Sequence, residues 1–124
     1  MKYISLFTLV FALLIICATG IAIADEADVV AVKATQTGKQ TYRFDVTIRH
    51  DDTNWEHYAD SWEVLAPDGS ILGTRVLAHP HINEQPFTRS LSGVKIPAGI
   101  NQVKIRVHDS VHAFGGDTMV VDLN

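Results

Sequence analysis

The sequence predicts an all-β fold, an antiparallel β-sandwich of about seven short strands. Apolar and polar residues alternate in short runs, which is the pattern of strands that bury one face and expose the other. Turn-forming residues separate these runs at regular intervals, and no segment shows sustained helical periodicity. Short strands at this spacing favour two packed sheets over any helical architecture.

In chain order, the expected strands are 29–35, 41–49, 59–65, 70–77, 86–94, 100–108 and 117–123. The alternation is clearest in 41–49, where Tyr42, Phe44, Val46 and Ile48 share one face. Ala66-Pro67-Asp68-Gly69 is typical of a β-turn, and Ile96-Pro97-Ala98-Gly99 turns another corner. Trp62 is expected in the core. This arrangement is typical of an immunoglobulin- or fibronectin-like sandwich.

The first 24 residues are typical of a cleavable secretory signal peptide. Residues 6–17 are almost wholly apolar but too short for a membrane span, which needs about 20 residues. Ala22-Ile23-Ala24 is the small-x-small pattern that signal peptidase reads, so cleavage is expected before Asp25. We therefore expect a signal peptide at 1–24 and a β-sandwich domain at 25–124, exported to the periplasm or secreted, with no membrane span in the mature chain. An uncleaved anchor over 4–23 is the alternative.

Cysteine content and charge narrow the classes of ligand. Cys17 is the only cysteine, and it lies inside the signal. Because Ile16 precedes it where a lipoprotein signal has a small residue, lipidation is not expected. The mature chain then has no disulfide and no thiolate for a metal. The formal net charge of −4 argues against a nucleic-acid partner, which requires a basic face.

All six histidines are predicted to lie at one end of the sandwich. In an up-and-down strand order, the connections 50–58, 78–85 and 109–116 share that end, and loops at one end of a rigid sandwich commonly carry function. Without thiolates, imidazole and carboxylate ligands suit copper, zinc or iron. The sequence therefore predicts a transition-metal site whose ligands come from His50, His57, His79, His81, His108, Asp109 and His112.

Other functions remain open for the same loops. Loop histidines also serve as hydrogen-bonding scaffold or as a pH-responsive surface. A non-catalytic module would contact an exported protein or a glycan, with Trp55, Tyr58 and Phe114 as anchors. No catalytic residue is assigned. If the chain is an enzyme, a metal-dependent redox protein is the class we expect, since an open coordination position makes a binding site reactive.

Two stretches resemble the superoxide reductases of the desulfoferrodoxin family. They are His57-Tyr58-Ala59-Asp60-Ser61-Trp62-Glu63, followed by Asp68-Gly69, and Asp109-Ser110-Val111-His112, followed by Gly115 and Gly116. The resemblance implies an immunoglobulin-like sandwich that binds iron at one end through four histidines and a cysteine. Here Asp109 stands at the position of that axial cysteine, and His50-Asp51 at the position of a His-Pro pair. Superoxide reduction relies on the thiolate, so the resemblance implies fold and site location rather than that activity.

Overall fold

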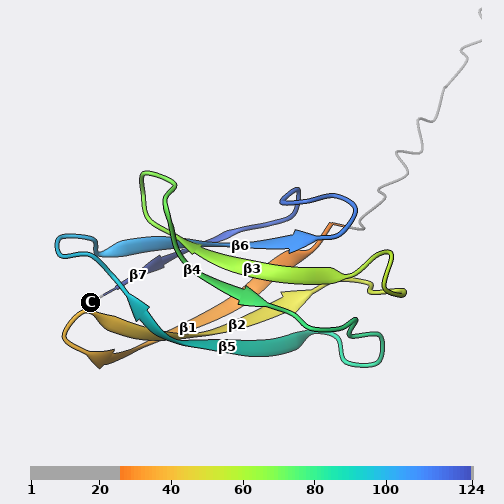
Figure 1. Ribbon diagram of the computed structural model, residues 1–124, viewed down its shortest axis with the longest axis horizontal. Helices are drawn as coiled ribbons and strands as arrows, with labels where there is room; N and C mark the ends of the chain where they lie inside the picture. Colours follow the sequence, from red (N-terminus) through yellow and green to blue (C-terminus); the bar gives the residue numbers. More distant parts are fainter. Residues whose placement is uncertain (1–25, 124) are drawn as a thin grey trace, which may run out of the picture.

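The computed structural model describes residues 26–123, and these form seven strands in two antiparallel sheets (Figure 1). The strands are β1 (Asp28–Gly38), β2 (Thr41–Arg49), β3 (Ala59–Leu65), β4 (Ile71–Val76), β5 (Phe87–Lys95), β6 (Gln102–Asp109) and β7 (Met119–Asp122). The predicted all-β sandwich is confirmed. The predicted signal peptide at 1–24 lies outside the described residues.

The two sheets have three and four strands. Their orders are β1-β2-β5 and β4-β3-β6-β7, and every neighbouring pair is antiparallel. The chain changes sheet between β2 and β3, between β4 and β5 and between β5 and β6. The β2–β3, β4–β5 and β6–β7 loops all lie at one end of the sandwich, on the right in Figure 1.

The core lies between the sheets and follows the alternation of the sequence. On β2, Phe44, Val46 and Ile48 are completely buried, and on β6 Ile105 is buried in the same way. Trp62 on β3 is also completely buried, as expected from the sequence. Each such side chain contributes about 1.5–3 kcal/mol by leaving water, so this core holds the two sheets as a rigid support for the loops.

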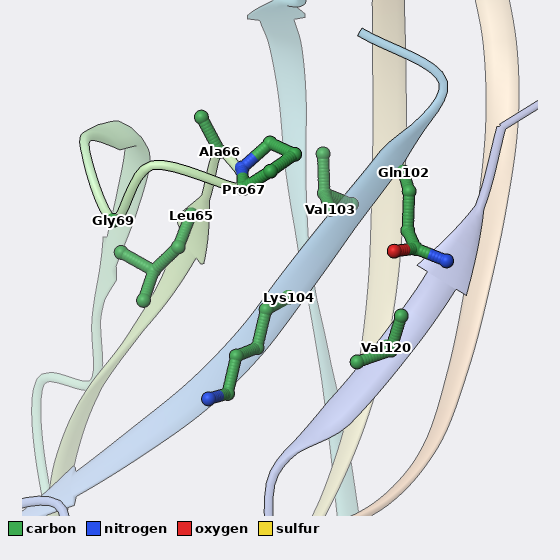
Figure 2. Close-up of a pocket in the computed structure, with 8 residues that line it drawn as sticks. All are labelled: Leu65, Ala66, Pro67, Gly69, Gln102, Val103, Lys104 and Val120. Carbon is green, nitrogen blue, oxygen red and sulfur yellow. The ribbon is translucent and has the colours of Figure 1, made fainter.

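The opposite end of the sandwich carries a shallow hollow. A surface hollow of about 280 Å³ lies there, beside the β3–β4 turn and the outer face of β6 and β7 (Figure 2). Its lining residues are Leu65, Ala66, Pro67, Gly69, Gln102, Val103, Lys104 and Val120, with no carboxylate or imidazole among them. Within residues 26–123 there is also no helix of the length and apolarity that crossing a membrane requires.

Candidate metal centre

Three side chains from distant parts of the chain converge where the core meets the loop end. His50 directly follows β2, His57 lies in the β2–β3 loop, and Asp109 is the last residue of β6. One donor atom from each lies within 4.8 Å of the others. We call these three residues, together with the adjacent His112, the candidate metal centre.

Strand periodicity aims two of these residues inward. His50 continues the buried face of β2 after Ile48, and Asp109 continues the buried face of β6 after Val107. Because alternate residues of a strand point to the same face, both side chains turn into the end of the core. His50 is 2% exposed and Asp109 is completely buried, so neither depends on a mobile surface loop for its position.

The distances between donor atoms approach those of a small coordination sphere. His50 Nε2 lies 3.3 Å from His57 Nε2. Asp109 Oδ2 is 3.7 Å from His50 Nε2, and Asp109 Oδ1 is 3.7 Å from His57 Nε2. Ligands bound tetrahedrally to one ion at 2.0–2.1 Å would be about 3.3–3.4 Å apart. The two distances to Asp109 involve different oxygens, and with one donor atom from each residue the three lie within 4.8 Å of one another. Small side-chain shifts would therefore let the three residues share one ion.

His112 supplies a fourth donor beside the first three. Its Nδ1 atom lies 3.3 Å from Asp109 Oδ2, and its ring centroid is 5.1 Å from that of His57. The β6–β7 loop turns here because the backbone N–H groups of Val111 and His112 donate to Asp109 Oδ1, at 2.8 and 2.5 Å. Asp109 Oδ2 and His112 Nδ1 are buried without a hydrogen-bond partner. A buried polar atom without a hydrogen bond calls for an explanation, and an ion bound between these two atoms would supply one.

A buried carboxylate behind His50 orients its imidazole ring. His50 Nδ1 donates a short hydrogen bond to Asp52 Oδ1, which also accepts from Ala59 N–H at 3.0 Å. Asp52 Oδ2 accepts from His81 N–H at 2.7 Å. With its proton held on Nδ1, His50 directs its basic Nε2 toward His57 and Asp109. Metal-binding histidines are commonly backed by a carboxylate in this way.

Both buried carboxyl groups favour the ionised state. Burial opposes ionisation of Asp52 most strongly, but hydrogen bonds from His50, His81 and Ala59 outweigh it and hold the pKa of Asp52 below its usual range. Burial likewise opposes ionisation of Asp109, and backbone N–H donors together with nearby imidazoles lower its pKa. Two buried negative charges at one end of the core create a potential that attracts a cation.

His79 and His81 form a separate pair in the β4–β5 loop. Their ring centroids are 4.6 Å apart, and the His81 ring stacks on Phe87 at 3.9 Å. His81 Nδ1 lies 3.9 Å from Asp52 Oδ2, so the pair adjoins the candidate metal centre from behind Asp52. Burial lowers the pKa of His81, and the charges of Arg89 and His79 act in the same direction.

His108 faces away from the candidate metal centre. It precedes Asp109 on β6 and so points to the outer face of the four-stranded sheet. There its Nδ1 atom lies 2.5 Å from Asp60 Oδ1, and its ring meets Phe114 edge-on at 4.9 Å. Of the seven predicted ligands, the structure thus brings four together, places two in the neighbouring pair and sets His108 apart.

Comparison with known proteins finds a similar sequence. The chain is similar to a protein of Halomicrobium mukohataei named "Putative lipoprotein". The two are 43% identical over 97 residues, which are 78% of this chain and 47% of the relative. The chain therefore spans about half the length of that protein. No family model matches the chain, and no solved structure matches it.

Sequence reasoning missed Asp52 as a functional residue. Asp51 and Asp52 are adjacent acidic residues in the same loop, and residue type alone does not distinguish them. In the structure Asp51 is exposed, whereas Asp52 is 6% exposed and accepts three hydrogen bonds. The two-residue periodicity of β2 offered one signal. If the pattern continues past the end of the strand, a carboxylate two residues after the inward-facing His50 can also point inward.

Proposed function

We propose that this protein binds a divalent transition-metal ion at the candidate metal centre, through His50, His57 and Asp109 with His112 alongside. The observation that carries this proposal is the convergence of His50, His57 and Asp109, with one donor atom from each within 4.8 Å of the others. His50 is backed by a buried carboxylate, and Asp109 is held by two backbone N–H groups. The ligands are therefore positioned before an ion arrives, which reduces the entropy lost on binding.

The donor set selects among ions. Three imidazoles and one carboxylate suit Zn²⁺, Cu²⁺, Fe²⁺ or Ni²⁺. Ca²⁺ and Mg²⁺ are disfavoured because they prefer shells made of oxygen atoms. His57 is partly exposed, with 16% of its side chain accessible, and His112 with 30%, whereas His50 and Asp109 are closed off. An ion would therefore enter between His57 and His112, and that side would hold any further ligand.

The place of action is outside the cytoplasm, in the periplasm or beyond the cell. The relative from Halomicrobium mukohataei carries the name of a lipoprotein, a class of exported proteins, which supports export of this chain. The small-x-small pattern at Ala22-Ile23-Ala24 supports the same location. We assign the protein a role in holding, delivering or sensing a metal ion in that compartment.

The resemblance to superoxide reductases extends to the candidate metal centre. The positions that carry it, His50, His57, Asp109 and His112, are the four that converge. The resemblance therefore supports a metal site at this end of the sandwich. Asp109 offers a carboxylate where that family has a thiolate, and a carboxylate gives less electron density to iron. We accordingly propose metal binding and assign no superoxide reduction.

Metal affinity measured against a competing chelator tests the proposal. The purified chain, stripped of metal, is titrated with Zn²⁺, Cu²⁺ and Fe²⁺. His57→Ala and His112→Ala are each expected to weaken binding by at least about tenfold, since even outer partners of a metal ligand contribute 10–100-fold. His108→Ala is the matched control, because it removes an imidazole from the same end but outside the centre. Unchanged affinity in both ligand variants would refute the proposal.

An interaction role is the second candidate, and exposed apolar side chains favour it. Trp55, Ile82 and Val111 are 65%, 57% and 57% exposed, and each lies in one of the three loops at this end. A glycan or exported protein docking there would cover Trp55. Trp62 is completely buried, so a shift in tryptophan emission would report on Trp55. Loss of that shift in Trp55→Phe would support docking, and an unchanged shift would contradict it.

A further inference from the structure

We infer that His79 and His81 form a second cation site, separate from the candidate metal centre, that takes an imidazole-preferring divalent ion such as Cu²⁺. The inference does not depend on the proposed function, because none of the four residues of the candidate metal centre belongs to this pair. It rests on three observations: the His81 ring is buried without hydrogen bonds, His79 has a defined tautomer, and both residues line one hollow.

His81 is a buried imidazole whose two ring nitrogens lack hydrogen bonds. The residue is 5% exposed, and neither Nδ1 nor Nε2 has a hydrogen-bond partner. Leaving a buried polar group unpaired costs about 1–3 kcal/mol. Stacking on Phe87, with the ring planes only 9° apart, fixes the plane in which those nitrogens lie. A fixed, unpaired imidazole is a ligand already in position.

His79 brings a second imidazole with a defined tautomer. Its Nδ1 atom lies 3.0 Å from the carbonyl oxygen of Pro80. A carbonyl only accepts, so Nδ1 carries a proton and Nε2 is the ring nitrogen left to bind an ion. The centroids of the His79 and His81 rings are 4.6 Å apart. Pro80 between them restricts the backbone, so the two rings are held together rather than meeting by chance.

Both histidines line a surface hollow of about 360 Å³ formed by residues 79–84. The hollow leaves His79 exposed to solvent, whereas the ring nitrogens of His81 lie buried beneath it. An ion would therefore meet His79 first and reach His81 from that side. Glu84 also lines it, but both of its carboxylate oxygens are bonded to Arg89, at 3.1 and 3.2 Å. The carboxylate on the inner side is Asp52, whose Oδ2 atom lies 3.9 Å from His81 Nδ1. Asp52 therefore stands between the second site and His50, as an outer partner of both.

A site made of two imidazoles binds some divalent ions much more tightly than others. The affinity of nitrogen ligands for divalent ions rises to a maximum at Cu²⁺ and falls again at Zn²⁺. Two imidazoles leave further coordination positions to water, so we expect this site to bind more weakly than the candidate metal centre. Cu²⁺ is therefore the probe with which the second site is most readily detected.

A purely structural role for His81 gives a different expectation. If the ring serves only as an aromatic partner for Phe87, replacing it with phenylalanine keeps the stack and removes two unpaired nitrogens. His81→Phe would then leave Cu²⁺ binding unchanged. His79→Ala is the second variant, and because His79 is exposed its replacement does not disturb the core.

Native mass spectrometry of the chelator-stripped full chain with Cu²⁺ tests the inference. The wild type and His108→Ala should each bind two ions, whereas His79→Ala and His81→Phe should each bind one, with affinity at the second site reduced at least about tenfold. The double variant His57→Ala/His112→Ala should keep the second ion. A wild type that binds one ion, lost in the double variant but kept in His79→Ala, would overturn the second site and leave the proposed function standing. Retention of two ions by either single variant would also overturn it.

Discussion

Replacing Asp52 with asparagine tests how the candidate metal centre is built. Asp52 touches no donor atom of the centre except through His50, whose Nδ1 proton it accepts. The asparagine side chain would fill nearly the same volume but carry no charge. We expect metal affinity to fall because the neutral amide holds His50 less firmly and makes its Nε2 less basic. Loss of an outer carboxylate typically lowers affinity 10–100-fold, which is about 1.4–2.7 kcal/mol.

The cost to folding follows from the three hydrogen bonds that Asp52 accepts. The Oδ1 atom receives two of them, from His50 and Ala59, so the amide oxygen of the variant should take that position. The amide NH₂ would then face the backbone N–H of His81, which now donates to Oδ2 at 2.7 Å. One buried donor left unpaired costs about 1–3 kcal/mol. For a domain of this size, each kcal/mol lowers Tm by about 4–8 °C.

Two measurements separate these effects. Titration against a competing chelator gives the metal affinity, and thermal unfolding in excess chelator gives the stability of the protein without metal. Asp51→Asn is the matched control, since it makes the same change at the exposed neighbouring position. If Asp52→Asn bound metal as tightly as the control and unfolded at the same temperature, Asp52 would have no part in positioning His50, and the reasoning would be refuted.

Two further predictions concern parts of the fold away from the metal ligands. A Cβ atom at Gly116 would lie 1.8 Å from the backbone oxygen of Ala27, so Gly116→Ala should lower stability by about 1–3 kcal/mol in urea unfolding, whereas Gly38→Ala, with only ordinary contacts, should not. The hydroxyl of Ser90 donates to Asp45 and, with smaller help from Arg43, lowers its pKa. A lowered folded-state pKa gives stability that is present above the unfolded pKa and lost as the pH falls through the folded pKa. Ser90→Ala should raise the pKa of Asp45 in a carboxyl NMR titration and reduce the stability that the protein loses on acidification. An unchanged pKa would contradict this prediction.

The sequence was most informative where a strand buries one face and exposes the other. The bounds of β2 agree with the predicted 41–49, and those of β3 with 59–65, because the apolar alternation starts and stops with the buried core. β1 extends beyond the predicted residue 35 to Gly38. Residues 36–38 are exposed and are held by backbone pairing with β2. Such pairing leaves no apolar pattern in the sequence.

The candidate site was predictable to the level of loops but not of side chains. Antiparallel topology brings the histidine-bearing loops to one end, and parity aims His50 inward. The same two-residue periodicity turns His108 outward. Assigning a histidine to a loop does not by itself show which way its side chain points. The selection of Asp52 over Asp51 depends on which carboxylate meets the N–H groups of distant segments. Those contacts arise only when the β4–β5 loop and the start of β3 pack against the β2–β3 loop.

The electrostatics of the centre link its stability to its proposed function. Asp52 and Asp109 place two ionised carboxylates in a region almost closed to water, beside the imidazoles of His50 and His112. Buried charges of one sign oppose folding unless they are solvated. Here four backbone N–H groups from three segments provide that solvation. The same hydrogen bonds hold the donor atoms in place, so a divalent ion would neutralise the two charges without rebuilding the loops. Binding of the ion would therefore stabilise the fold in proportion to its affinity, because an unfolded chain could not assemble these ligands.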